Sequence, residues 1–313
     1  MTFKVEKYAS AREFEWDEFI RSAKNGHFMF FRRYMEYHSE RFQDCSLMVF
    51  DELGSLVAIL PANSDGASLH SHQGLTFGGV VVGTKCHMTE YLKIFESILL
   101  NVKSLGFERL VYKVIPVIYH VRPAQEDLYA LFLANARLIR RDVSSAIPLA
   151  YSFKYSKGRK SSISKAKKLG VAFEADVSLK EAWDLIDEVL LKRHNVNPVH
   201  SLPEIQCLKK DFPENIRVFG ARLDGILVSV AVVYVYNGVA HTQYLACSEK
   251  GQLIGALDLL LNKLISEIFP DYSYFDFGIS NEQAGRYLNN GLISYKESFG
   301  GNPVVHDFYE VLL

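Results

Sequence analysis

The chain has 313 residues, of which 49% are hydrophobic and 23% charged, and its formal net charge is −1. This length is enough for two domains of ordinary size, and the composition is that of a globular protein. A charge near zero excludes a global field that would draw the chain to nucleic acid or to an anionic membrane. No apolar run approaches the ~20 residues that span a bilayer, and the N-terminus lacks the apolar core of a signal peptide. The four cysteines form no C-x-x-C pair, which predicts reduced thiols and a cytoplasmic protein.

The first half of the chain alternates between helical and strand periodicity. Ser10 is expected to cap the first helix, with Glu13 completing a capping box. The predicted elements are helices over residues 11–24 and 30–42, two strands within 47–62, a strand over 68–82, a helix over 88–105, a strand over 109–115, a helix over 124–136 and a strand over 142–149.

The second half opens on a basic stretch, residues 154–168, which contains seven Lys or Arg and no acid. Asp224-Gly225 is a strong hairpin signal between two apolar runs, and Ser178 is a good helix cap. The predicted elements are a strand over 171–175, a helix over 179–193, strands over 216–222, 226–236 and 239–246, a helix over 254–268, a strand over 274–277, a short helix over 282–288, and strands near 293–299 and 304–311.

The two halves share one order of elements, and short stretches such as 48–61 and 217–232 align by eye. This pattern favours an internal duplication, although mixed α/β proteins can give such matches by chance. We therefore expect an α/β (α+β) protein with two tandem units, 1–152 and 153–313. Each unit would be a mixed, mainly antiparallel, twisted sheet flanked by helices.

Residues 239–261 combine a strand, a polar loop with two glycines and an amphipathic helix. The first-turn N–H groups of such a helix are unpaired, and the helix dipole adds partial positive charge there. This arrangement predicts an anion site.

Two segments carry a family likeness. Residues 291–300, GLISYKESFG, fit the pattern G-L-x-x-(Y/F)-K-x-x-(F/W)-G, and the basic stretch 157–171 resembles a segment that opens a second unit. Together with the order of elements, these segments resemble the FemAB-like (Fem-type) branch of GNAT acyltransferases, and especially single-chain members encoded among bacterial surface-polysaccharide genes. The resemblance implies two tandem GNAT units. The first unit would be degenerate and form a wall for the acceptor, and the second would hold the donor.

The resemblance also implies an acyl-CoA loop of the form (R/Q)-x-x-G-x-(G/A). Gln252 and Gly255 match this pattern, but Leu257 stands where it has Gly or Ala. Acetyl-CoA or another acyl-CoA would be the co-substrate. The expected donor-binding residues are Lys250, Gly251, Gln252, Gly255, Ala256, Ser280 and Asn281.

Amide formation needs a base for the amine and a donor for the oxyanion. His241 and Gln243 share one face of their strand, so His241 is a candidate base; alternatively, the two side chains satisfy each other within the sheet. Tyr244 could protonate a leaving thiolate, or it could simply pack. Lys296 matches the lysine of the family pattern, which implies charge balance at the donor or the transition state.

The acceptor is expected to contact polar residues from both halves. Asp276 follows a central strand, where it could orient the amine or cap the next helix. In the polar loop 193–205, a metal site at His194, His200 and Glu204 lacks further ligands at a usual spacing, so a loop over the acceptor is the better interpretation and no metal is expected. The candidate acceptor residues are His72, Lys113, Arg159, His200, Glu204 and Asp276.

The predicted function is N-acyl transfer from acyl-CoA to an amine, with an amino sugar on a nucleotide or lipid carrier as acceptor. We expect no DNA partner. One alternative is a Fem-type transferase that uses aminoacyl-tRNA, which the net charge disfavours. Another alternative is a non-catalytic binding protein with a decayed donor site, which Leu257 supports. The sequence alone names neither the acyl group nor the acceptor, and it leaves the oligomeric state open.

Overall fold

The computed structural model describes residues 2–313, apart from the side chains of Arg193 and His194, so the expectation for His194 lies outside the described part. The chain packs into two compact units. The first contains the residues up to Asp142 together with Glu282–Tyr287 and Val305–Leu313, and the second contains Val143–Asn281 and Leu288–Val304. The order of elements predicts a division after residue 152, whereas each packed unit is built from separate stretches. Both units are mixed α/β, with mostly antiparallel sheets flanked by helices, which confirms the expected fold class.

The first unit contains a four-stranded sheet in the order β1-β3-β4-β7 and a second set of strands in the order β17-β8-β6-β5-β2. Its strands are β1 (Lys4–Lys7), β2 (Gln43–Asp44), β3 (Leu47–Phe50), β4 (Leu56–Leu60), β5 (Asn63–Asp65), β6 (Ser68–His70), β7 (Val81–Val82), β8 (Arg109–Lys113) and the greater part of β17 (Asn302–Leu312). Its helices are α1 (Glu13–Ser22), α2 (Arg32–Glu36), α3 (Met88–Ser104) and α4 (Glu126–Leu133), with 3-10 turns at Ser10–Arg12, Phe28–Phe30 and Val117–Tyr119.

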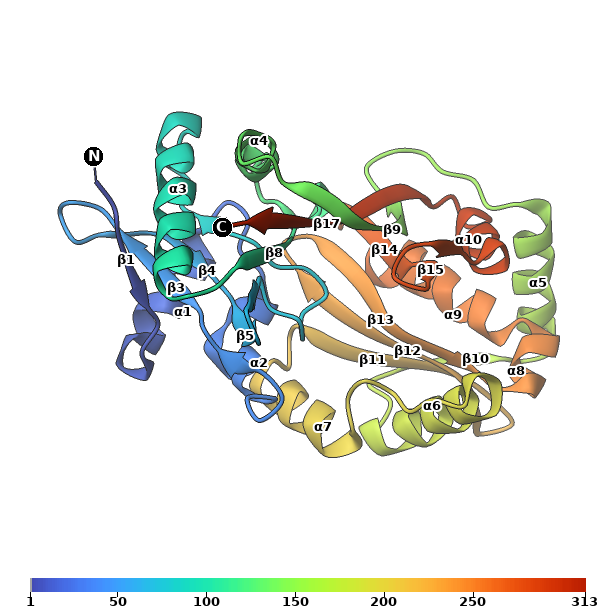
Figure 1. Ribbon diagram of the computed structural model, residues 1–313. Coiled ribbons are helices and arrows are strands. Elements are labelled where there is room, and N and C mark those ends of the chain that lie inside the picture. The colour runs from blue at the N-terminus through green and yellow to red at the C-terminus, as the bar shows by residue number, and fades with distance from the viewer. Residues whose placement is uncertain (1) are drawn as a thin grey trace. The chain divides into compact units, whose positions relative to one another are not determined.

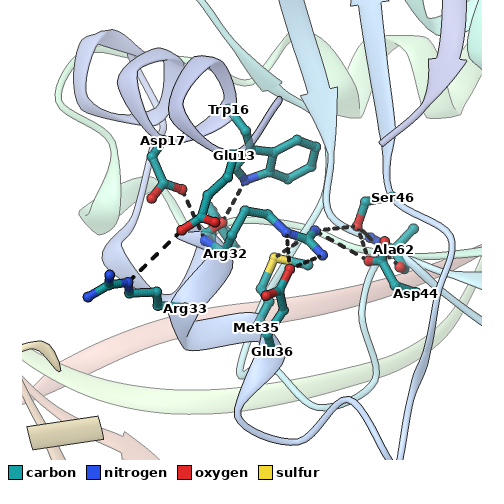
Figure 2. A network of polar contacts seen from close by, with 11 residues as sticks. Glu13, Trp16, Asp17, Arg32, Arg33, Met35, Glu36, Asp44, Ser46 and Ala62 are labelled. Carbon is teal, nitrogen blue, oxygen red and sulfur yellow. Dashed lines mark hydrogen bonds and ion pairs between the residues drawn. The ribbon is translucent and has the colours of Figure 1, made fainter. Parts of the chain in front are cut away.

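A buried arginine joins the helices of the first unit to its strands. Arg32 of α2 exposes only 2% of its surface, and its guanidinium lies 3.7 Å from the centroid of the Tyr8 ring. It donates hydrogen bonds to Glu36, Asp44 and Ser46 at 3.1–3.3 Å (Figure 2). A buried charge is tolerated when it is paired and hydrogen-bonded in this way. The network therefore fixes α2 against β2 and the start of β3.

In the second unit, the strands lie in the order β10-β11-β12-β13-β14-β9. The strands are the second half of β9 (Arg137–Pro148), β10 (Ala172–Ala175), β11 (Ile216–Leu223), β12 (Ile226–Tyr236), β13 (Val239–Cys247) and β14 (Tyr274–Ile279). The helices are α5 (Lys157–Lys168), α6 (Leu179–His194), α7 (Leu202–Asp211), α8 (Glu249–Ile254), α9 (Ala256–Lys263) and α10 (Asn290–Glu297), and a π-helical stretch, Leu264–Ile268, continues α9.

Helices cover both faces of the β11–β13 meander. Leu245 of β13 packs into the apolar core that includes Leu260 of α9 and Ile163 of α5. Its neighbour Tyr244 points to the opposite face, where its ring lies 5.3 Å from that of Trp183 in α6. In Figure 1, α6 and α7 run beside this meander.

The sequence predicts the meander well, because its turns carry strong local signals. The hairpin around Asp224-Gly225 forms as expected, and both residues adopt positive φ. Ser178 caps α6 by accepting the N–H of Glu181. The strand expected over 239–246 is present as β13.

Two predictions near the C-terminus are wrong. Residues 293–299 are expected as a strand but lie largely in α10, which Asn289 caps by accepting the N–H of Leu292. The alternation of residues 293–299 also fits a helical period, so periodicity alone is ambiguous there. The helix expected over 282–288 is instead a turn between β15 (Asn281–Glu282) and β16 (Tyr287–Leu288). Residues 283–285 all have positive φ, which a right-handed helix excludes.

Other elements are shorter than predicted. The strand expected over 68–82 is interrupted after His70 by a loop in which His72 and Gly79 have positive φ. The helix expected over 30–42 is reduced to α2. Ser10 begins a 3-10 turn rather than capping α1, and no side chain caps either element. Among the described residues, no helix combines the length and apolar character needed to cross a membrane.

Candidate functional site

The central strands of the second unit separate partway along their length. β13 pairs with β14 in parallel over Val239–His241 and Tyr274–Asp276, and within the described residues this pairing ends there. Just beyond, the register of β13 against β12 skips Gln243, which is a β-bulge. A bulge adds one residue and bends the strand. The bend therefore coincides with the point at which β13 leaves β14.

A histidine–aspartate pair sits at this point of separation. Nδ1 of His241 lies 2.8 Å from Oδ2 of Asp276. Asp276 is fully buried, and its other oxygen accepts hydrogen bonds from the Ser144 hydroxyl and from the Gly278 N–H. Because the carboxylate accepts a hydrogen bond from Nδ1–H, Nε2 is the ring nitrogen that can take up a proton. Of the two roles considered for Asp276, capping a following helix is wrong, because no helix forms over 282–288, and orienting the acceptor amine stays a prediction.

Lys296 lies on the other side of Gly278. Its ammonium donates to the carbonyl oxygens of Gly278 and Ile279, both at 2.7 Å. Burial lowers the pKa of Lys296 to about 8, while the Asp276 carboxylate acts in the opposite direction. A Cβ on Gly278 would lie 3.2 Å from Cε1 of His241, and its φ is +76°. Gly278 therefore lies between the two side chains: its carbonyl accepts a hydrogen bond from Lys296, and a side chain at this position would contact the His241 ring.

A cavity of about 520 Å³ opens beside Lys296 within the same unit. Helices α8 and α9 meet at its wall, where Gly255 has φ +78° and a Cβ would lie 2.4 Å from Oγ of Ser162. Only glycine fits this junction. The lining residues are Arg159, Ser162, Val189, Leu190, Leu245, Cys247, Gly251, Gln252, Gly255, Leu257, Asp258, Leu292, Tyr295 and Lys296.

The cavity wall contains an ion pair that sequence reasoning missed. Asp258, in the first turn of α9, accepts hydrogen bonds from Nη1 of Arg159 at 2.6 Å and from the Tyr295 hydroxyl at 2.8 Å. The guanidinium also lies 4.8 Å from the centroid of the Tyr295 ring. An acid in a first helical turn usually only stabilises the helix dipole, so no sequence signal singles out Asp258.

The structure brings some of the expected donor residues together and leaves others apart. Gly251, Gln252 and Gly255 line the cavity, whereas Ala256 is fully buried. Lys250 lies 3.9 Å from Asp224 at the surface. Donor binding by all of these residues stays a prediction.

Ser280 and Asn281 follow β14 and are not among the lining residues of the cavity. Oγ of Ser280 is buried and has no hydrogen-bond partner within the described part of the chain. Oδ1 of Asn281 accepts the N–H of Val143 at 2.5 Å. Asn281 therefore has a clear structural contact, and its role in donor binding stays a prediction.

Tyr244 lies on the α6 face of β13 and is also absent from the cavity lining. Its hydroxyl is 2.6 Å from Nδ1 of His200, and burial raises its pKa to about 12. Glu204 completes a capping box with Ser201 at the start of α7. Gln243 occupies the bulge, so the expectation that it shares a strand face with His241 is wrong, and the register places His241 on the face of Tyr244. The catalytic and acceptor roles expected for these residues are untested.

The two candidate residues of the first unit form a buried cluster. The ammonium of Lys113 donates to the carbonyl oxygens of His72, Gln73 and Leu75 at 2.6–3.1 Å. Burial lowers the pKa of Lys113 to about 7. Burial also lowers the pKa of His72 to about 3, with a contribution from His38. The contacts within this unit hold a loop together.

In the described residues, no group of three or more His, Cys, Asp or Glu side chains could hold a metal ion.

In the second unit, the bulged strand β13 thus leaves its parallel neighbour β14 near two helices, α8 and α9, that meet at Gly255. Residues 154–297 match the family model described as "Acetyltransferase (GNAT) domain". No curated protein matches the chain.

Solved structures extend this likeness beyond the matched region. The chain is similar to FemX at 11% identity and a TM-score of 0.69, covering 99% of this chain and 97% of that one. It is also similar to a tandem GNAT protein from the clavulanic acid biosynthesis pathway (12% identity, TM-score 0.55, 99% and 98% covered). L-PGS from Bacillus licheniformis matches at 14% identity and a TM-score of 0.59, with 85% and 83% covered. The chain therefore has a Fem-like tandem GNAT fold, as the sequence resemblance predicts.

Proposed function

We propose that this protein transfers an acyl group from an acyl-CoA thioester to an amine. The acceptor is an amino sugar carried on a nucleotide or a lipid, and the product serves cell-surface polysaccharide synthesis. The observation that carries the proposal is the His241–Asp276 pair at the point of strand separation, with Gly278 between it and Lys296. Lys296 lines the cavity, whereas His241 and Asp276 are not among its lining residues.

The chemistry assigns a separate task to each of the three side chains. The amine attacks the thioester carbonyl, and Nε2 of His241 takes the amine proton. Asp276 orients the imidazole and stabilises its protonated form. Lys296 has a third N–H beyond the two that bind carbonyls, and this donor can stabilise the oxyanion. When the carbon–sulfur bond breaks, the thiolate takes the proton from His241 and the amide remains.

The cavity fits the phosphates of the carrier at its helical wall. Gly251, Gln252 and Gly255 line it, but the N–H groups of Gly251 and Gln252 are taken by Ser248, and that of Gly255 by the Gln252 carbonyl, so the carrier would contact this wall by shape and through side chains. Arg159 also lines the cavity, where Asp258 balances its positive charge. Leu257 lines the cavity where the family pattern has Gly or Ala. A donor site that has lost its function would also show a large residue at this position.

Asp258 favours a second candidate, transfer of an aminoacyl group from aminoacyl-tRNA. Its carboxylate neutralises Arg159, and the cavity wall therefore lacks the net positive charge that a diphosphate would favour. In this case the product would also be an amide, and the roles of His241 and Lys296 would be unchanged.

Calorimetric titration with acetyl-CoA separates these candidates. Binding that is weakened by Gly255→Leu supports the acyl-CoA proposal, whereas binding only to charged tRNA, falling steeply as salt rises, supports the second candidate. Absence of both supports a non-catalytic role.

Turnover tests the proposed base. His241→Ala should lower kcat by about 100- to 10,000-fold while the Kd for acetyl-CoA changes less than about twofold. Asp276→Asn should lower kcat as well, because the tautomer is no longer fixed. If the turnover of His241→Ala equalled that of the wild type between pH 6 and pH 9, His241 would be excluded as the general base. His120→Ala, at a partly buried histidine of the first unit, serves as a control for general effects of losing an imidazole.

A further inference from the structure

One end of the second unit gathers exposed lysines and exposed aliphatic side chains. We call it the α5–α8 end, and its members are Lys165, Lys167, Lys168, Leu169, Ile226, Lys250 and Leu253. Three contacts show that the segments converge: the ammonium of Lys165 donates to the Leu253 carbonyl at 2.8 Å, Ala172 of β10 pairs with Arg222 beside the hairpin turn, and Lys250 lies 3.9 Å from Asp224 in that turn. Figure 1 shows the end of α5 close to β10 and α8.

Most lysines of α5 lack the ion pairs that several helical lysines of this unit make. Lys180, Lys192 and Lys263 each pair with an acid one helical turn away. The exposed lysines in and just before α5 have no carboxylate within ion-pair distance in the part of the chain that the structure describes; these are Lys154, Lys157, Lys160, Lys167 and Lys168. The helix itself contains no acid. Its positive charge is therefore not neutralised within the unit.

Three aliphatic side chains project beside these lysines. Leu169 at the end of α5 is 47% exposed, Ile226 at the hairpin is 60% exposed, and Leu253 in α8 is 75% exposed. A single exposed aliphatic residue needs no explanation. Three of them at converging turns, next to unpaired lysines, have the composition of a surface that enters a bilayer interface.

We propose that the α5–α8 end binds the surface of an anionic phospholipid bilayer. The lysines contact headgroup phosphates, and Leu169, Ile226 and Leu253 enter the boundary between headgroups and acyl chains. The net charge of −1 does not oppose this contact, because distant charges are screened over about 10 Å. The inference is independent of the proposed reaction, and it places the cavity wall formed by α8 near a membrane.

A nucleic acid fits this surface less well. Recognition of RNA and single strands uses aromatic stacking and arginine, but the α5–α8 end presents aliphatic side chains. The arginine of α5, Arg159, is held by Asp258 in the cavity wall.

Vesicle sedimentation with the full chain tests the proposal. The protein should bind phosphatidylcholine–phosphatidylglycerol vesicles at low salt and fail to bind pure phosphatidylcholine. Lys167→Gln combined with Lys168→Gln should weaken binding about 25-fold, from roughly fivefold per lysine. Ile226→Ser combined with Leu253→Ser should weaken binding at both low and high salt, because the apolar contribution is not screened.

A matched control uses α3 of the first unit, where Lys93→Gln, Lys103→Gln and Leu100→Ser change equally exposed side chains. This control should bind vesicles like the wild type. The proposal is overturned if the wild type does not bind anionic vesicles, or if the variants of the α5–α8 end bind them as tightly as the control does. It is also overturned if the lysine pair affects the binding of total tRNA while vesicle binding is unchanged. Circular dichroism shows that each variant is folded.

Discussion

Lys113 in the first unit and Lys296 in the second are buried lysines that each donate to two or more backbone carbonyls, and they differ in what else they face. Lys113 in the first unit binds three carbonyls of a single loop, and burial lowers its pKa to about 7. Lys296 in the second unit binds two carbonyls at the end of β14 and lines a cavity, with a pKa lowered to about 8.

The difference lies in the donors that remain after the internal contacts are made. An ammonium has three N–H groups. The three contacts of Lys113 use all three N–H groups, so this lysine stabilises the conformation of residues 72–75 and has no donor left. Lys296 keeps one N–H for a group in the cavity. Buried lysines with similar pKa shifts can thus differ in the donors that their internal contacts leave available.

The largest expected effect is that of removing the lysine that faces the cavity. Lys296→Met should lower kcat by about 100- to 1,000-fold, which is the usual loss for one oxyanion donor. Steady-state kinetics measure it. In the wild type the rate should fall above about pH 8, because Lys296 loses its proton there; in the variant this alkaline limb should be absent. If the rate of the variant still fell above about pH 8, a group other than Lys296 would be responsible for that fall.

Removal of the enclosed lysine should act on stability instead. Lys113→Met leaves three buried carbonyls without their donor, and the free energy of unfolding should fall by about 2–3 kcal/mol. Urea titration measures this change. The kcat of the folded variant should stay within about twofold of the wild type. A large rise in the KM for the acceptor with unchanged stability would instead place Lys113 in acceptor binding, as the sequence predicts.

A smaller effect concerns His72, whose carbonyl is one of the acceptors of Lys113. The pKa of its ring is about 3 in the folded chain and about 6.5 when unfolded. Between these values only the unfolded chain binds the proton, so stability is complete above about pH 6.5 and falls as the pH drops. His72→Asn, which tolerates the φ of +64°, should therefore reduce the loss between pH 7 and pH 5 by about 2 kcal/mol. Urea titrations at both values compare the variant with the wild type, and equal losses would show that another group titrates.

The sequence predicts the elements whose signals are local. Asp224-Gly225 and Ser178 act within a few residues, and the hairpin and α6 form where they indicate. Residues 283–285 carried no such signal, because Gln283 and Ala284 adopt left-handed conformations that are rare for their residue types. The segment 293–299 fits two periods at once, and only the Asn289 cap could have decided between them.

The candidate site is predictable only in part for a similar reason. His241 and Lys296 could be selected from residue type and family pattern. The contact between His241 and Asp276 joins residues 35 positions apart on neighbouring parallel strands, and no spacing rule gives that register. Asp258 was missed because an acid at a helix start is common.

The bulge at Gln243 has a consequence for how this protein tolerates change in length. Removing that one residue would give β12 and β13 an unbroken register and leave Tyr244 and Leu245 opposite Val232 and Ala231, on the faces that they already occupy. The bend that accompanies the separation of β13 from β14 would be lost, and with it the shape of the strand that carries Leu245 and Cys247 into the cavity lining. The site thus depends on the number of residues in a strand as much as on their identity, and a deletion there should be more damaging than most substitutions.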